Sequence, residues 1–378
     1  MSPAAAYGGM GQRRRWWLGL VVLLIGVLVA VRTLAPDRGP MLRELVREET
    51  IRVDPRTELA RGSGYAVTLG SYIENLHSLS LRQRMFNAEG FYWLEWPREV
   101  QELLEKQGIT ALQLVELTNQ VNSSSAQIQA DTPTPVARPG DRFYQLFRYS
   151  ASFYIPVVDL KRSPFERLVL PILFEVVPDA FARQNKNVVL VHDGDPRSSQ
   201  IGAYATINGY DIEDVRFVSS SHSYGTDWGM GQGDLDYSRL AAEVVMRSDL
   251  FSSFVTWILP LLIVMLIVLL APSLVGELGD VRLAIPSTAL LTLIFLQQSY
   301  KAELPSLSYL TFLDCLYAYS YIVSLVLFVL FLWGTNVYSE ASEQERTGAL
   351  RRINRMDRVF QLTACAGFVL IAIWAWLA

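Results

Sequence analysis

The chain has few of the residues on which soluble enzymes and small secreted domains depend. Its 378 residues include two cysteines, Cys315 and Cys365, and both lie in apolar segments, so we expect no disulfide framework. Its three histidines, His77, His192 and His222, form no Ser–His or Cys–His arrangement visible in the sequence. The formal net charge of −4 excludes a strong basic excess. We therefore predict no enzymatic activity, no cofactor and no nucleic-acid partner.

Two short motifs carry residue types that bind metals or phosphate in other proteins. The run HDGD (192–195) follows a strand-like segment, and its composition is typical of a turn. The run GMGQG (229–233) lacks the Lys-Ser/Thr pair and the strand-to-helix context of a phosphate loop. The sequence therefore predicts no metal site and no phosphate loop.

Apolar residues are abundant and occur in blocks. They make up 51% of the chain, and the mean hydropathy of +0.23 is too high for an ordinary soluble protein of this size. Near the start, three arginines at 13–15 precede an apolar run over 16–31. Residues 1–35 are therefore predicted to be a signal peptide or an uncleaved signal anchor, and the polar residues 36–63 a tether. The arginines keep the start in the cytoplasm, so the following domain is expected outside.

Residues 64–248 have the sequence pattern of a β-sandwich. Short alternating runs, broken by Gly, Asn, Asp and Pro, predict many strands joined by turns. The strand-like runs are 65–76, 86–96, 143–155, 166–177 and 187–193. One helix is expected over 97–108, with Pro97 suited to its first turn, and residues 121–141 have the composition of a loop.

Residues 249–378 contain apolar segments that predict a transmembrane domain of four helices. The segments run over about 251–271, 280–305, 309–334 and 358–378, and the second is the least apolar. Arginines concentrate in 336–357, between the third and fourth segments. By the positive-inside rule this stretch is cytoplasmic. The expected protein is thus multi-pass in the inner or plasma membrane, with the sandwich on the periplasmic or extracellular side.

The second apolar segment, DVRLAIPSTALLTLIFLQQSYKAELP (280–305), has one polar face. Steps of four and three residues place six residues on that face of a helix: Asp280, Ala284, Thr288, Leu291, Phe295 and Gln298. Several copies around an axis would line a water path that closes at its apolar belt. Alternatively, the helix is buried in a bundle and its polar groups bond to neighbouring helices. The segment alone leaves both interpretations open.

The residues that follow favour the first interpretation. ELPSLSYLTFLD (303–314) leads directly into another apolar helix, and the whole region resembles the second helix, linker and third helix of pentameric ligand-gated ion channels, the Cys-loop receptor superfamily, prokaryotic type. Residues 153–175, with Pro164-Phe165-Glu166, resemble the signature loop of this superfamily. Further stretches resemble its second strand, its ninth strand, its ligand-capping loop and its last strand: 86–96, 208–217, 222–229 and 236–247.

The resemblance implies an extracellular antiparallel β-sandwich that binds ligand, followed by an α-helical bundle of four transmembrane segments. It also implies a homopentamer with bound lipid and permeant cations. Movement of the sandwich would reach the pore through an Arg247–Glu166 pair and the linker 304–309. The residues with this implied coupling role are Arg247, Asp159, Pro164, Phe165, Glu166, Leu304, Pro305 and Tyr309. One departure is the loop 79–85, which is basic where the superfamily often has an acid.

The same resemblance implies a gate and a selectivity filter. Leu291 occupies the position of the central pore leucine, with Phe295 beside it, and a leucine ring closes a narrow pore by dewetting. Glu277 and Asp280 precede the basic Arg282 and predict cation selectivity. Pro286 departs from the pattern, because a proline inside a helix removes a backbone donor and can kink it.

Aromatic residues are the candidates for agonist binding. In the superfamily an aromatic box lies under the capping loop, and the matching residues here are Trp93, Tyr224, Trp228 and Tyr237. Such a box would stabilise an amine by cation–π contacts. The sequence leaves the agonist open between a small molecule and a proton. It also leaves open a second function, that of a non-conducting membrane receptor that keeps this fold.

Overall fold

The computed structural model describes residues 48–60, 64–121, 126–177, 187–195, 201–226, 236–274 and 279–377. By its contacts the chain forms two units. The larger comprises Thr50–Ser223 and Leu235–Ala378 and contains the elements discussed below, apart from the first residue of β1. Most of the smaller unit, Met1–Glu49 and Tyr224–Asp234, lies outside the described residues. The predicted signal segment 1–35 lies there entirely.

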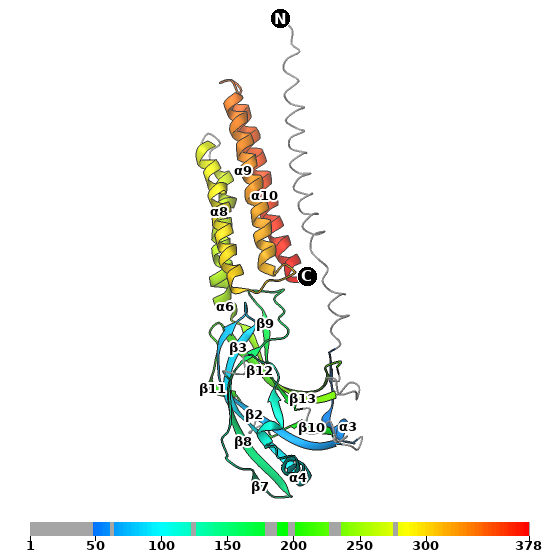
Figure 1. The fold of residues 1–378 in the computed structure, drawn as a ribbon. Coiled ribbons are helices and arrows are strands. Elements are labelled where there is room, and N and C mark those ends of the chain that lie inside the picture. The colour runs from blue at the N-terminus through cyan, green and yellow to red at the C-terminus, as the bar shows by residue number, and fades with distance from the viewer. Residues whose placement is uncertain are drawn as a thin grey trace. The chain divides into compact units, whose positions relative to one another are not determined.

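Two β-sheets form the N-terminal domain (Figure 1). One sheet has the order β1 (Glu49–Arg52), β12 (Tyr210–Ser223), β13 (Asp236–Ser248), β9 (Arg167–Val176), β4 (Val115–Leu117). The main strand order of the other sheet, which we call its path, is β10 (Asn187–His192), β2 (Gly64–Ser80), β3 (Met85–Pro97), β8 (Arg142–Tyr154), β5 (Gln120–Val121). Off this path β11 (Ile201–Ala205) pairs with β2, and β6 (Gln127–Ala130) and β7 (Val136–Arg138) pair with β8.

Alternation along the strands builds the core between the sheets. In β3 every second residue from Phe86 to Trp96 is buried, as expected for a strand with one face in the core. Tyr92 of β3 stacks on Phe147 of β8 at 4.9 Å and meets Phe174 of β9, in the other sheet, at 5.3 Å between ring centroids. Such aromatic contacts join the two sheets, and the predicted β-sandwich is confirmed.

The local predictions in this domain were mostly accurate. The predicted helix is α4 (Arg98–Gln107), which ends at Gly108 in the left-handed region (φ 67°). Pro97 is the residue before its first turn rather than within it. The predicted loop 121–141 was partly wrong, because β6 and β7 lie within it. Part of the predicted tether is also ordered, as β1 and the short helix α3 (Pro55–Ala60).

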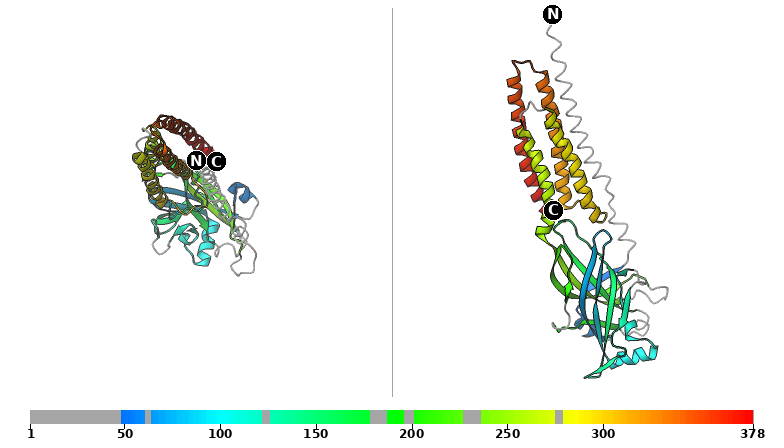
Figure 2. Two further views of the ribbon diagram at one scale, coloured as in Figure 1. Left: turned by 90° about the horizontal axis from the view of Figure 1, so that it is seen from above. Right: turned by 90° about the vertical axis from the view of Figure 1, so that its left-hand side faces the viewer.

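The C-terminal part contains four helical stretches long and apolar enough to cross a membrane, so the chain is a multi-pass membrane protein. The first, Leu250–Ser273, comprises α6 (Leu250–Ser253), a π-helical turn (Phe254–Ile258), α7 (Leu259–Leu270) and a 3₁₀ turn. The others are α8 (Gly279–Glu303), α9 (Phe312–Glu340) and α10 (Arg346–Leu377). Figure 2 shows α8, α9 and α10 running alongside one another, and α9 packs against both of the others.

The four predicted spans are confirmed, and two of the helices extend beyond the apolar segments that marked them. The third helix continues past residue 334 to Glu340, and the fourth begins at Arg346 rather than near 358. Hydropathy marks the part of a helix that fits in a bilayer, whereas backbone hydrogen bonding continues through the polar residues beyond it. The segment between these helices therefore shrinks to residues 341–345.

Candidate functional site

Helix α8 exposes the whole predicted stripe. Each of its six members is exposed in the single chain: Asp280, Ala284, Thr288, Leu291, Phe295 and Gln298. The two bulkiest, Leu291 and Phe295, are 56% and 64% exposed. The opposite face is buried through Arg282, Pro286, Ala289, Leu293 and Tyr300. α8 thus has one packed face and one open face, and the open face carries Asp280, Thr288 and Gln298.

Two neighbouring glutamines show how sharply the faces divide. Gln297 turns toward α9, where its side-chain NH₂ donates to Asp314 (3.3 Å) and its oxygen accepts from the Tyr321 hydroxyl (2.6 Å). Gln298 lies on the open face. Ser287 is also exposed, and its hydroxyl donates to the Leu283 carbonyl over 2.8 Å, so this donor has its acceptor within the helix.

Pro286 does not interrupt α8. The helix runs unbroken from Gly279 to Glu303, and Pro286 is buried on its packed face. The missing N–H therefore lies away from the open stripe. Asp280 lies exposed in the first turn of the helix. Glu277, the other predicted selectivity carboxylate, lies outside the described residues.

The other end of α8 is fixed to the start of α9. Thr311 and Asp314 form a capping box at the first turn of α9. The Lys301 ammonium lies 2.6 Å from the buried Asp314 carboxylate, and the Tyr300 hydroxyl donates to Thr311 over 2.9 Å. These contacts define the conformation of the linker 304–311.

This linker contacts the loop between β8 and β9, residues 155–166, which we term the junction loop. The Leu160 N–H donates to the Tyr309 hydroxyl over 3.0 Å. In return, the Phe312 N–H donates to the Lys161 carbonyl over 2.7 Å. Leu304 is buried and Pro305 half-buried. The junction loop is therefore joined to the linker through the Tyr309 side chain, and to the first residue of α9 through a backbone hydrogen bond that side-chain substitution leaves in place.

Aromatic packing extends the junction to α10. Phe165 of the junction loop lies 6.3 Å from Phe312 and 6.0 Å from Trp376 between ring centroids. The preceding Pro164 accepts a hydrogen bond from the Ser248 hydroxyl over 2.8 Å. The predicted coupling residues Pro164 and Phe165 thus contact the end of β13, the start of α9 and the end of α10.

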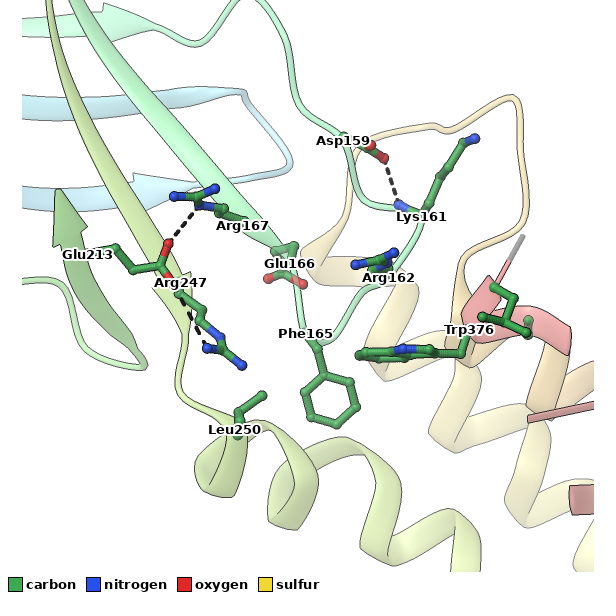
Figure 3. A pocket seen from close by; sticks show the side chains of 12 residues that line it. Asp159, Lys161, Arg162, Phe165, Glu166, Arg167, Glu213, Arg247, Leu250 and Trp376 are labelled. Carbon is green, nitrogen blue, oxygen red and sulfur yellow. Dashed lines mark hydrogen bonds and ion pairs between the residues drawn. The ribbon is translucent and has the colours of Figure 1, made fainter. Parts of the chain in front are cut away.

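The predicted Arg247–Glu166 pair is wrong, because the two side chains have other partners. Glu166 is 5% exposed and accepts a hydrogen bond from the Tyr210 hydroxyl over 2.6 Å. Glu213 instead lies 3.9 Å from Arg247 and 2.7 Å from Arg167. Four of these residues line an open cleft of about 630 Å³ (Figure 3): Glu166, Arg167, Glu213 and Arg247.

Strand register explains this error. Arg247 of β13 lies directly opposite Arg167 of β9. Glu166 immediately precedes Arg167, and successive side chains along an extended chain point to opposite faces. Glu166 therefore directs a carboxylate oxygen to the Tyr210 hydroxyl rather than to either arginine, although the residue also borders the cleft. Asp159, the remaining predicted coupling residue in the junction loop, accepts a hydrogen bond from the Lys161 N–H over 3.1 Å.

The basic turn between β2 and β3 also reaches the junction loop. Arg84 donates from its guanidinium to the Pro156 carbonyl. The same guanidinium lies over the Tyr154 ring, 5.1 Å from its centroid. A cation held by a carbonyl and an aromatic face needs no carboxylate partner. This contact accounts for a basic residue in a turn where the resemblance led us to expect an acid.

The predicted aromatic box is only partly described. Trp93 lies on the face of β3 opposite the core and donates to the Asp193 carboxylate over 3.1 Å. Tyr237 belongs to the other sheet and is buried. Tyr224 directly follows β12, and Trp228 lies outside the described residues. The agonist role of these four residues stays a prediction.

Sequence reasoning missed a charged cluster on the sheet of β9, β12 and β13. Arg239 and the buried Glu175 form an ion pair at 2.6 Å across neighbouring strands. Burial and the charge of Arg239 lower the pKa of the nearby His222 to about 4, and Thr50 Oγ1 lies 2.7 Å from its Nδ1. The pairing depends on strand register, so spacing along the chain gave no signal for it.

No protein-family profile matches this chain, and no curated protein sequence matches it significantly. Within the described part of the chain, no group of three or more His, Cys, Asp or Glu side chains is placed to hold a metal ion. The sandwich, the four candidate spans and the open face of α8 are therefore the observations on which a function is argued.

Proposed function

We propose that the chain is the subunit of a homopentameric, ligand-gated, cation-selective ion channel. The open face of α8 carries the argument. A helix at the centre of a bundle or facing lipid would not be expected to present a carboxylate, hydroxyls and an amide along one exposed line. Five such lines around an axis would form a water-filled path, and α7, α9 and α10 would separate that path from lipid.

The order of residues on the open face gives each level of the path a role. Asp280 forms a ring of carboxylates at one mouth, which favours cations. Leu291 and Phe295 form the apolar belt, which excludes water when the helices lean inward. Thr288 lies between the two levels, and Gln298 lines the mouth nearest the sandwich.

Gating would start in the sandwich and end at the belt. An agonist, either a small molecule or a proton, changes the sandwich, and the junction loop passes the movement to the linker 304–311 through the bonds at Tyr309 and Phe312. The sandwich lies on the extracellular or periplasmic side in this proposal, because the arginine-rich end of α10 belongs in the cytoplasm. The protein is proposed to be a channel and not an enzyme.

Ionic current through planar bilayers tests this proposal. Purified wild-type protein is recorded in a NaCl gradient during a step from neutral to acidic pH, and then with candidate amines. Current that reverses near the Na⁺ equilibrium potential supports a cation channel, and Asp280→Asn should move the reversal toward the Cl⁻ potential. Reversal of the wild-type current near the Cl⁻ potential would overturn the selectivity.

The rival function predicts a different result. A non-conducting receptor with the same fold would stay silent under every condition, including with Leu291→Ala, in protein shown to be folded and assembled. A channel with Leu291→Ala should leak or open more easily, because truncation of the belt admits water.

A further inference from the structure

A buried ion pair joins α8 to α10 at the end of α8 away from the junction loop. The Arg282 guanidinium donates to the Asp357 carboxylate, and both side chains are only 3% exposed. The guanidinium also lies over the Phe331 ring of α9, 4.1 Å from its centroid. Helices α8, α9 and α10 therefore meet at this buried ion pair.

The pair lies at the level of the proposed cation-selective mouth. Asp280 is two residues before Arg282, in the first turn of α8. Residues 358–377 of α10 would by themselves cross the ~30 Å of bilayer hydrocarbon at about 1.5 Å per residue. Asp357 precedes that stretch, which places the pair at the edge of the hydrocarbon rather than at its centre. Asp280 and Arg282 thus share one end of α8 but point to opposite faces.

Arg282 is a fixed positive charge behind the proposed ring of carboxylates. A guanidinium does not lose its proton inside a protein, so burial cannot neutralise it. Its Nε has no hydrogen-bond partner among the described residues. Its counter-charge therefore comes from Asp357, with a smaller contribution from the Phe331 ring.

We infer that Asp357 is a specificity-determining residue of the channel, although it lies outside the pore. By neutralising Arg282 it leaves the Asp280 ring to set the sign of the potential at the mouth. Without Asp357, five uncompensated guanidinium groups would lie one helix width behind five carboxylates and oppose them. The surroundings have a low dielectric constant, so the opposition would be strong. This inference rests on the proposed function.

Reversal potentials in a NaCl gradient test the inference in five proteins: wild type, Asp357→Asn, Asp357→Glu, Arg282→Gln, and the double variant Arg282→Gln/Asp357→Asn. Asp357→Asn should lower the Na⁺/Cl⁻ permeability ratio at least about fivefold, since a full charge about 10 Å away is left unbalanced. The double variant should return the ratio to within about twofold of wild type, because it removes both charges. Arg282→Gln should keep or raise the ratio. Asp357→Glu should behave like wild type.

A purely structural role for the pair predicts another pattern. All three Gln and Asn variants would then be less stable or less well assembled, with no change in permeability ratio. An unchanged ratio in Asp357→Asn would overturn the inference and leave the proposed channel intact. A lowered ratio in Arg282→Gln or in the double variant would also overturn it.

The inference stays testable even if the Asp357→Asn variant fails to fold. If Asp357→Asn does not assemble because an uncompensated charge is buried, the double variant still decides, since it buries neither charge, and Arg282→Gln leaves only a carboxyl group, which can take up a proton. No current from wild type and Leu291→Ala, with assembled protein in the bilayer, would overturn the proposed function itself and this inference with it.

Discussion

The Tyr210 hydroxyl donates a 2.6 Å hydrogen bond to Glu166 and thereby connects the start of β12 to the junction loop. Burial, reinforced by the neighbouring Glu166 carboxylate, raises the pKa of Tyr210 above its ordinary value. The hydroxyl therefore keeps its proton and stays a donor at any physiological pH. The other carboxylate oxygen of Glu166 is buried without a partner among the described residues.

Replacement of Tyr210 by Phe should destabilise the protein by about 1–3 kcal/mol, because it removes a donor from a buried carboxylate. Thermal unfolding in detergent measures this loss. Tyr204→Phe is the matched control, since Tyr204 is 78% exposed and should lose nothing measurable. Equal unfolding midpoints for the two variants would contradict the role given to Tyr210.

Acid should weaken the sandwich through His222. The pKa of His222 is lowered to about 4 in the folded protein, against about 6.5 when unfolded, so between these values the unfolded chain binds more protons. Stability therefore falls as pH decreases from about 6.5 to about 4, by an amount on the order of 1–3 kcal/mol. The measurement is the unfolding midpoint as a function of pH.

His222→Asn should flatten this dependence over the same pH window, whatever its effect at neutral pH. Ser221→Ala is the control, because Ser221 is next in the same strand and points to the other face. An equally steep pH dependence in His222→Asn would show that other groups control the acid response.

Leu291 and Leu293 allow the open and packed faces of α8 to be compared directly. Leu293 is fully buried, so Leu293→Ala should cost about 2–5 kcal/mol of stability. Leu291 is 56% exposed in the single chain, so Leu291→Ala should cost much less but increase basal current in bilayers. The reverse assignment, with Leu293→Ala opening the pore, would show that α8 is rotated relative to the proposed axis.

The buried carboxylate of Asp314 should matter far more than an exposed one. Asp314→Asn removes the partner of Lys301 and half of the capping box, which we expect to cost about 2–4 kcal/mol. Glu343→Gln breaks the exposed pair with Arg346 and should cost less than about 0.5 kcal/mol. Thermal unfolding of both variants in one detergent tests the difference.

Local patterns in the sequence predicted the strands and helices. They did not predict the side-chain partners, which depend on contacts between residues far apart in the chain. Alternation marked β3 and β8 because one face of each strand is buried, and hydropathy marked the four spans because lipid demands apolar surface. The stripe on α8 was also readable, since helical spacing alone defines a face. The partners of Glu166 and Arg247 were not, because both partners lie on β12 and depend on how that strand pairs with β13. The Arg282–Asp357 pair, 75 residues apart in the chain, left no signal either.

The lengths of α9 and α10 have a mechanical consequence. Their 29 and 32 residues measure about 44 and 48 Å, more than the ~30 Å of hydrocarbon, and tilts within the usual ~40° do not absorb the excess. The two helices therefore project into water as a stiff lever arm, joined at its tip by residues 341–345. A small change in the tilt of α10 at the bilayer becomes a larger displacement at that tip, where a probe at the exposed Glu343 would record it.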